Sequence, residues 1–285
     1  MTRRTFVRLV GAAAVGGAVL HAAAPAARAA DGPVMVVVAH TDDDLLFLSP
    51  DILHVVQANQ PLLLVYTTAG EAGEGSDYWQ SLEEGIRSTY AQIAGTDNSW
   101  SDLPNGVPGR SFSRQGLDGT GIEVAFLHIP DGRTDGTGTA TYGYDSIIKL
   151  WDGRIDTVGL VDGSDYYGRD DLISLLTALM VDFAPTQILT QTWPGAYTDT
   201  GDHSDHWATA NFAREASHAY AAGQSLTGYY AYIIGDWDEN VSGDDLDAKT
   251  AAFTNFAGYD HNIGVPYAQD TYGLWLKRQY ISATE

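Results

Sequence analysis

The sequence predicts a single α/β domain with a Rossmann-like, mostly parallel sheet and helices on both faces. Three observations lead to this class. Residues 34–38 form a continuous apolar run, which is typical of a strand buried on both faces of a parallel sheet. A short helical segment and a second apolar run at 62–67 follow, which together make a right-handed βαβ unit. Helical and strand-like segments then continue to alternate, as an α/β fold requires.

The remaining elements follow from periodicity and turn signals. Ser49-Pro50-Asp51 has the pattern of a helix start with proline in the first turn, and apolar side chains at helical spacing between residues 79 and 93 predict an amphipathic helix. Residues 133–168 are rich in Gly, Asp, Thr and Tyr and are expected to form loops. The other expected elements are strands at 124–129, 187–192 and 229–234, and helices at 51–59, 171–181, 206–222 and 246–259.

The first thirty residues have the pattern of a twin-arginine export signal. Arg3 and Arg4 precede an apolar stretch, and Ala-Arg-Ala at 27–29 forms a small-x-small cleavage site. The alternative is a membrane anchor, but the apolar stretch at 9–20 is too short to span a bilayer and His21 interrupts it. We therefore expect residues 1–30 to be cleaved and residues 31–285 to form a secreted or extracytoplasmic domain.

Charge and cysteine content exclude several classes of function. The chain carries 15 basic and 37 acidic side chains, and removal of the leader leaves 11 and 37, a net charge of −26. Such a surface repels nucleic acid and anionic membranes, and it favours a neutral or cationic ligand. The chain has no cysteine, so any metal site must be built from His, Asp or Glu.

Two polar clusters follow predicted strands. His40 and three consecutive aspartates come directly after the 34–38 run, and the segment DHSDH at 202–206 follows the 187–192 strand. Ligands of open α/β sheets bind at the carboxyl ends of the strands, so the two clusters are expected to lie close together. His40, one of the aspartates and one or both of His203 and His206 can supply the three protein ligands of a catalytic zinc. A second aspartate beside the metal could accept a proton from water, which suits metal-assisted hydrolysis.

Each of these patterns also has a structural interpretation. Three adjacent aspartates alone are more typical of a solvated loop or a helix start, and it is the expected placement of both clusters at one sheet edge that favours a metal. The glycines at 70, 73 and 75 do not have the GxGxxG order, which excludes a dinucleotide site. The acidic stretch at 236–247 departs from a calcium loop at its glycine and at its last acid, so an ordinary acidic loop is favoured.

The two clusters also carry a family resemblance. AHTDDDLLF at 39–47 resembles the AHPDDE signature of the PIG-L/LmbE-like, zinc-dependent N-acetylglucosaminyl deacetylases, and HSDHWATA at 203–210 resembles their HPDH segment. Weaker similarities at 67–75, 129–132 and 245–260 extend the resemblance over residues 34–260. The chain departs from the family pattern at Thr41, which replaces proline, at Asp44, which replaces glutamate, and at Tyr90, where the family often has glutamate.

The resemblance implies a role for each matched position. His40, Asp43 and His206 would bind zinc, Asp42 would be the general base, and His203 would stabilise the oxyanion or protonate the departing amine.

Three further positions are candidates for binding substrate. The resemblance implies that Arg87 holds a substrate hydroxyl or a phosphate-like group and that Asp131 lies near the sugar. Tyr197 closely precedes the HxDH pair, so it is a candidate helper of the oxyanion.

We therefore expect a secreted, zinc-dependent hydrolase that removes an N-acetyl group from an N-acetylglucosamine-type sugar or glycoconjugate. Two alternatives stay open: hydrolysis of another amide, such as one in a natural product, and a carbohydrate-binding protein without catalysis. The intact set of ligands and base argues against the second alternative. Zinc is the expected cofactor, although cobalt and iron accept the same ligands. The expected partner is an N-acetylated sugar or glycoconjugate, without nucleic acid and without membrane insertion of the mature form.

Overall fold

The structure is a computed structural model of the chain and describes residues 32–285. The expected export signal, residues 1–30, lies outside the described residues. Within residues 32–285, no helix combines the length and the apolar character that crossing a bilayer requires.

A mixed sheet of eight strands forms the centre of the domain. Its strands are β1 (Val34–Val38), β2 (Leu62–Thr68), β3 (Trp100–Asp102), β4 (Ser113–Leu117), β5 (Ile122–Ile129), β8 (Gln187–Gln191), β9 (Ser225–Tyr229) and β10 (Ile281–Thr284). The strand order is β10-β9-β8-β1-β2-β5-β4-β3. The strands from β9 to β5 are parallel to one another. At the edges, β10 pairs antiparallel with β9, β4 pairs antiparallel with β5, and β3 pairs antiparallel with β4. The predicted mostly parallel sheet is thus confirmed.

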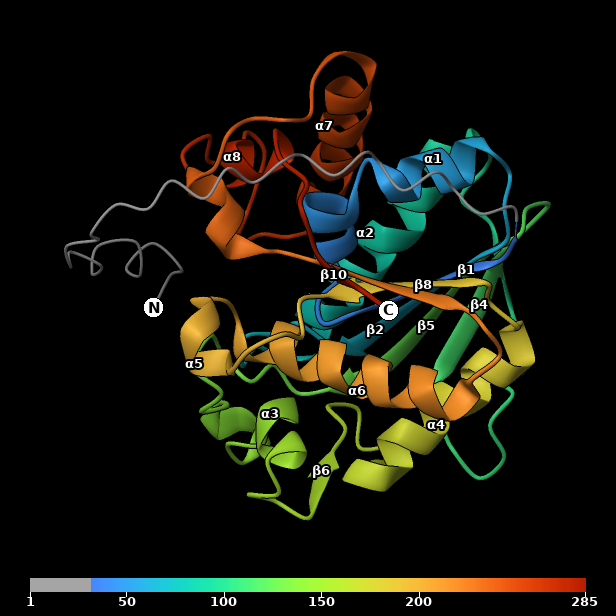
Figure 1. Cartoon of the computed structure of the whole chain (residues 1–285), viewed down its shortest axis with the longest axis vertical. Helices are drawn as coiled ribbons and strands as arrows, with labels where there is room; N and C mark the ends of the chain where they lie inside the picture. The colour runs from blue at the N-terminus through green and yellow to red at the C-terminus, as the bar shows by residue number, and fades with distance from the viewer. Residues whose placement is uncertain (1–31) are drawn as a thin grey trace.

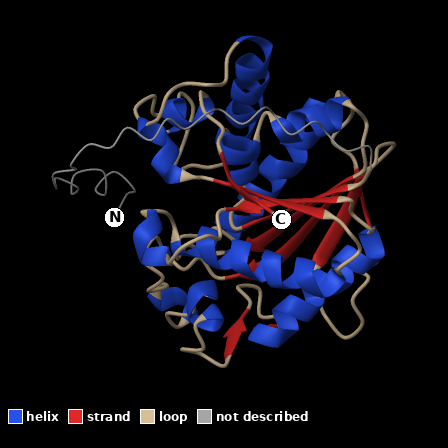
Figure 2. Ribbon diagram, in the orientation of Figure 1, coloured by secondary structure: helices blue, strands red, loops and turns tan. Residues whose placement is uncertain are grey.

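Helices cover both faces of this sheet (Figures 1 and 2). One face carries α1 (Asp51–Gln57), α2 (Ser76–Ala94), α7 (Gly243–Ala257) and α8 (Tyr272–Leu276). The other carries α3 (Ile147–Trp151), α4 (Arg169–Phe183) and α6 (Ser204–Tyr220), and the short α5 (Tyr197–Thr200) precedes α6. Shorter elements are the π-helix η2 (Asp44–Leu48), the 3-10 helices η3 (Ala140–Tyr142) and η4 (Tyr232–Asp236), and the hairpin of β6 (Thr157–Gly159) and β7 (Tyr166–Gly168).

The two hydrophobic cores explain the apolar runs of the central strands. In β1, Val34, Val36 and Val38 pack under the α1/α2/α7 layer, while Met35 and Val37 pack under the α4/α6 layer. All five side chains are fully buried. A strand covered by helices on both faces has no solvent-facing position, so it shows no alternation of apolar and polar residues.

Most of the expected elements occur with shifts of a few residues at their ends, but the prediction of a strand at 229–234 is wrong. The strand in this region is β9, which ends at Tyr229, and the chain then turns into η4. Gly228 lies in β9 because Trp193 packs against it: a Cβ at this position would meet the indole ring at 2.5 Å. The predicted loop region at 133–168 is mostly irregular but also contains η3, α3 and the β6–β7 hairpin.

The parallel strands bring distant segments to one edge of the sheet. The segment after β1 begins with Ala39 and His40, the loop after β2 contains Glu71, the loop after β5 contains Asp131, and α6 follows β8 through residues 192–203. Because β8, β1, β2 and β5 are neighbours in that order, these four segments meet.

Candidate metal centre and active site

The turn after β1 fixes a carboxylate beside an imidazole. The backbone N–H of His40 donates to Asp43 Oδ2 at 2.6 Å, and the same oxygen lies 3.2 Å from His40 Nδ1. Asp43 is the residue that precedes η2, so its backbone position is set by the start of that helix. Asp42 belongs to the same turn and is half-buried.

The start of α6 supplies the second half of the cluster. Asp202 Oδ1 accepts hydrogen bonds from the backbone N–H of His203 and from His206 Nδ1, each at 2.8 Å. His203 is the N-cap residue of α6, and its Nδ1 accepts the backbone N–H of Asp205 at 3.2 Å. The first turn of the helix therefore holds both imidazole rings in defined orientations.

Three side chains from the two segments converge on one point. His40 Nδ1 lies 3.1 Å from His206 Nε2, which lies 2.9 Å from Asp43 Oδ1, and all three residues are buried. The ligand atoms of a tetrahedral zinc site lie roughly 3.3 Å apart, given bonds of about 2.0–2.1 Å. The spacing and chemistry of these donor atoms therefore fit a divalent transition metal. The structure thus brings the three predicted ligands together, and their role as ligands stays a prediction.

Each of the two converging histidines also has a carboxylate at its other ring nitrogen. His40 Nε2 lies 3.4 Å from Asp205 Oδ2, and His206 Nδ1 lies 2.8 Å from Asp202 Oδ1. Metal-binding histidines usually have such a partner, which fixes the tautomer and the orientation of the ring. This arrangement is a second observation, independent of the convergence, that fits a metal at this point.

The electrostatics of the cluster favour a bound positive charge. Burial by itself lowers the pKa of His40, but the carboxylates of Asp43, Asp205 and Asp131 outweigh burial and raise the pKa well above its ordinary value. For His206, burial also lowers the pKa, while Asp43 and Asp202 raise it to about 9. Burial raises the pKa of Asp43, but His206 and His40 outweigh it and lower the pKa well below the ordinary range.

The His203 ring lies beside those of His40 and His206, but its Nδ1 is occupied by a backbone hydrogen bond. Its ring centroid is 4.5 Å from that of His40 and 5.3 Å from that of His206. Because Nδ1 accepts a backbone N–H, the proton of the neutral ring sits on Nε2, which lies 4.0 Å from Asp131 Oδ1. His203 can therefore donate a hydrogen bond toward the space between the two segments, and its catalytic role stays a prediction.

Asp131 and Glu71 add buried acids to the same centre. Asp131 Oδ2 lies 3.9 Å from His40 Nε2, and its expected position near the sugar stays a prediction. The backbone N–H of Asp131 donates to the carboxylate of Glu71, and burial together with the charge of Asp131 raises the pKa of Glu71 to about 8. Glu71 and Asp205 were not predicted as site residues. Glu71 belongs to the TTAGEAGEG segment and Asp205 to the HSDH segment, but the sequence of these segments does not show which acids face the candidate metal centre.

Tyr197 lies at the rim of the centre. Its hydroxyl donates to the backbone carbonyl of Thr134. Burial raises the pKa of Tyr197, and the charges of Asp135, Asp205 and Asp202 raise it further. The side chain is therefore within electrostatic reach of the cluster, and its substrate-binding role stays a prediction.

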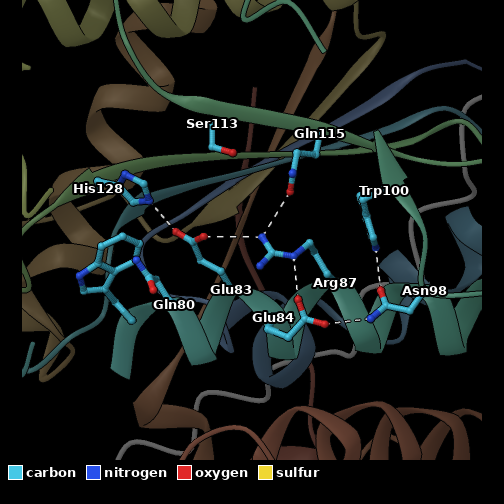
Figure 3. A pocket seen from close by; sticks show the side chains of 10 residues that line it. Gln80, Glu83, Glu84, Arg87, Asn98, Trp100, Ser113, Gln115 and His128 are labelled. Carbon is cyan, nitrogen blue, oxygen red and sulfur yellow. Dashed lines mark hydrogen bonds and ion pairs between the residues drawn. The ribbon is translucent and has the colours of Figure 1, made fainter. Parts of the chain in front are cut away.

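Arg87 is the predicted site residue that the structure places elsewhere. Its guanidinium contacts Glu84 at 3.1 Å, Glu83 at 3.6 Å and Gln115 at 3.3 Å in a surface pocket of about 540 Å³ (Figure 3). The residues that line this pocket include none of the predicted metal ligands. The role of Arg87 in holding a substrate group stays a prediction, and it would have to be performed from this pocket.

Two of the departures from the family signature meet in the structure. The Tyr90 hydroxyl donates to Asp44 Oδ2, and both residues are fully buried. Burial raises the pKa of Asp44 to about 7. The shorter acid at position 44 is thus matched by a tyrosine that reaches it from α2.

A comparison with protein families agrees with this geometry. The model of the family described as PIG-L, GlcNAc-PI de-N-acetylase, matches residues 35–217. The chain belongs to the PIG-L family. The predicted resemblance is thereby confirmed, and the chain is an enzyme of the N-deacetylase class, a hydrolase. The matched range runs from β1 into α6 and includes both halves of the candidate metal centre.

Similarity to individual proteins is low. No curated protein matches the chain. Among solved structures, the A40926 pseudoaglycone deacetylase Dbv21 is similar at 14% identity and a TM-score of 0.46, over 86% of this chain and 89% of that chain. N,N'-diacetylchitobiose deacetylase from Pyrococcus horikoshii is similar at 14% identity and a TM-score of 0.43, over 86% and 75%. GalB, the 4-carboxy-2-hydroxymuconate hydratase of Pseudomonas putida KT2440, is similar at 15% identity and a TM-score of 0.46, over 86% and 83%.

Proposed function

We propose that this PIG-L protein is a zinc-dependent deacetylase that removes the acetyl group from an N-acetylglucosamine-type sugar or glycoconjugate. The observation that carries the proposal is the convergence of His40, Asp43 and His206, with a separate aspartate behind each imidazole. Two neutral imidazoles and one carboxylate are ligands typical of catalytic zinc, and they leave a position for water.

The surrounding residues supply the proton transfers of amide hydrolysis. When bound, zinc acts as a Lewis acid and lowers the pKa of a coordinated water to about 7. Asp42, one residue from the ligand Asp43, takes the proton of the attacking water as general base. His203 donates its Nε2–H as a hydrogen bond to the developing oxyanion, and the proton that Asp42 has taken from the water passes to the nitrogen of the departing amine as the C–N bond breaks. Asp202 and Asp205 hold the two ligand imidazoles in position.

The charge around the site supports a neutral substrate. Asp131 and Asp205 are buried beside His40 and would repel an anionic group. An acetamido group is neutral, and the amine that its hydrolysis leaves becomes a cation that these acids attract. The family description, which names a de-N-acetylase of a GlcNAc group, points to an amino sugar as the carrier of the acetyl group that water removes.

Metal content and acetate release test this proposal together. The purified mature protein should retain close to one zinc per chain and should release acetate from N-acetylglucosamine or its oligomers. Removal of the metal with a chelator should abolish release, and zinc should restore it. Absence of bound metal together with absence of acetate release would overturn the proposal. Release from a non-sugar amide alone would move the substrate to the alternative class.

We also propose that the mature enzyme acts outside the cytoplasm. Arg3-Arg4, the apolar stretch that follows and the Ala-Arg-Ala site at 27–29 support export by the twin-arginine route. Replacement of both arginines by lysine should leave a folded, active protein in the cytoplasm. Unchanged secretion would assign the leader to another route.

A further inference from the structure

A polar groove separates α2 from the antiparallel strands at the edge of the sheet (Figure 3). Glu83 and Arg87 line it from the helix, and Ser113, Gln115 and His128 line it from β4 and β5. We call this feature the α2–β4 groove. It has a volume of about 540 Å³ and is separate from the metal ligands. Polar side chains on the face of a sheet that lies beneath a helix are unexpected, because such a face normally packs against apolar residues.

The charged side chains of the groove are already paired with one another. Arg87 contacts Glu83 at 3.6 Å and Glu84 at 3.1 Å. His128 lies between two carboxylates, with Nε2 2.5 Å from Glu83 and Nδ1 3.0 Å from Asp162. A charged ligand would therefore have to displace an existing ion pair in order to bind. The groove favours a neutral ligand.

Other groups on the two walls have hydrogen-bonding capacity to spare. Gln80 on α2 and Ser113 on β4 line the groove, and neither side chain bonds to another residue in the part of the chain that the structure describes. Two indoles complete the walls: Trp79 packs on the His128 ring at 4.7 Å, and Trp100 is held by a hydrogen bond from its Nε1 to Asn98 at 2.9 Å.

These walls offer both kinds of surface that a bound sugar needs, polar groups for its hydroxyls and an aromatic ring for its apolar face. Sugar hydroxyls need both donors and acceptors, which a carboxamide and a serine hydroxyl provide. The C–H face of a pyranose is apolar and packs on an aromatic ring. A neutral carbohydrate therefore fits the groove better than a phosphate, a peptide terminus or a lipid.

The groove is connected to the candidate active site through two elements. His128 precedes Asp131 by three residues, so their Cα atoms lie within roughly 10 Å at the rise of an extended chain. On the other wall, α2 begins directly after the loop that contains Glu71. An oligosaccharide bound at the metal centre could extend into the groove.

We propose that the α2–β4 groove binds a second, neutral sugar unit of the substrate, remote from the acetamido group that is hydrolysed. This inference rests on the proposed function and deepens it, because it makes the substrate an oligosaccharide or a glycoconjugate. Gln80 and Ser113 would bind hydroxyl groups of the remote unit, and the partly exposed indole of Trp100 would contact its ring.

A double variant, Gln80→Ala with Ser113→Ala, tests the groove without breaking any hydrogen bond of the described structure. Gln57→Ala is the matched control, because Gln57 is an exposed helical glutamine on α1 outside the groove. KM and kcat are measured for N-acetylglucosamine and for its β-1,4-linked tetramer with the zinc-loaded enzymes. In the double variant, KM for the tetramer should rise roughly tenfold, as expected for the loss of two net hydrogen bonds. Gln57→Ala should leave KM for the tetramer unchanged.

A binding measurement separates this proposal from the proposed function. The tetramer is titrated calorimetrically into the mature Asp42→Asn protein, with and without the two groove substitutions. Tetramer binding that weakens with the groove substitutions supports the groove even if the wild-type enzyme releases no acetate. In that case only the proposed function is wrong. Turnover of the tetramer with the same KM in the double variant and in Gln57→Ala overturns the groove and leaves the proposed function standing. Absence of tetramer binding overturns the groove as well.

Discussion

Removal of the Asp202 carboxylate should weaken zinc binding although Asp202 is not a predicted ligand. Its Oδ1 accepts hydrogen bonds from His206 Nδ1 and from the backbone N–H of His203, each at 2.8 Å. In Asp202→Ala, the His206 ring loses the group that sets its tautomer and its orientation. The ring can then rotate, and its Nε2 is no longer held at the point where His40 and Asp43 converge.

The size of the effect follows from the bond that is lost. A hydrogen bond to a charged group contributes about 1.5–3 kcal/mol, and about 1.4 kcal/mol corresponds to a tenfold change in affinity. The dissociation constant for zinc should therefore rise about 10- to 100-fold, which is also the usual cost of losing a carboxylate behind a metal-binding histidine. Asp202→Asn keeps an acceptor without the charge and should fall between the wild type and Asp202→Ala.

Competition with a chromogenic zinc chelator measures this change, and circular dichroism checks that the variants are folded. Asp170→Ala is a suitable control, because the Asp170 side chain is 95% exposed and lies in α4. An unchanged zinc affinity in folded Asp202→Ala would show that the carboxylate does not orient the ligand. The interpretation of the aspartates behind the histidines would then be wrong.

Three further predictions concern the base, the buried tyrosine and the groove histidine. Asp42→Asn should keep zinc and lose roughly 100- to 10,000-fold in kcat/KM. Asp43→Asn should instead lose zinc, because a charged ligand becomes neutral. Metal analysis and acetate release distinguish the two variants, and a metal-free Asp42→Asn would reverse the two roles. Tyr90→Phe removes the donor to the buried Asp44 and should lower the free energy of unfolding by about 1–3 kcal/mol in denaturant melts; an unchanged value would show that this hydrogen bond contributes nothing. Burial lowers the pKa of His128, but its two carboxylate partners outweigh burial and raise it above 6.5, so its stabilisation is complete below about pH 6.5 and is lost as pH rises through the folded pKa. The stability difference between the wild type and His128→Gln should therefore shrink with rising pH, and a difference that grows would contradict the ion pairing.

The centre of the fold could be predicted because burial leaves a mark on the sequence. β1 and β2 are apolar at nearly every position since both of their faces are covered, and that pattern is visible without a structure. The meeting of His40 with His206 could be predicted for a related reason. β1 and β8 are adjacent parallel strands, so the segments that follow them lie at one edge.

The strand β9 could not be placed because its pattern is set by a neighbour. Gly228 is required by the Trp193 ring that packs on it, and no local propensity records that contact. The aromatic residues that follow resemble a strand, yet they turn into η4 and put Tyr232 beside His206, with ring centroids 5.1 Å apart. Tertiary contacts override β propensity at both positions.

The carboxylate partners of His40 and His206 could not be predicted either. Asp202 and Asp205 are both close to His206 in the sequence, but Asp202 binds His206 and Asp205 faces His40. The path of the loop that carries Asp202 and the rotation of α6, whose first turn carries Asp205, decide this division. For the same reason, the helical position of Arg87 could be predicted, whereas the side of α2 on which its side chain lies could not.

The concentration of so many polar groups in one turn has a kinetic consequence. Asp202, His203, Asp205 and His206 belong to five consecutive residues at the start of α6. Helix ends open locally at a lower free energy than the core strands of a sheet. A single opening of this turn would withdraw one ligand and both orienting carboxylates together. The residence time of the ion would then be governed by the breathing of one helical turn, and amide hydrogen exchange in that turn should run in step with metal release while the sheet stays protected.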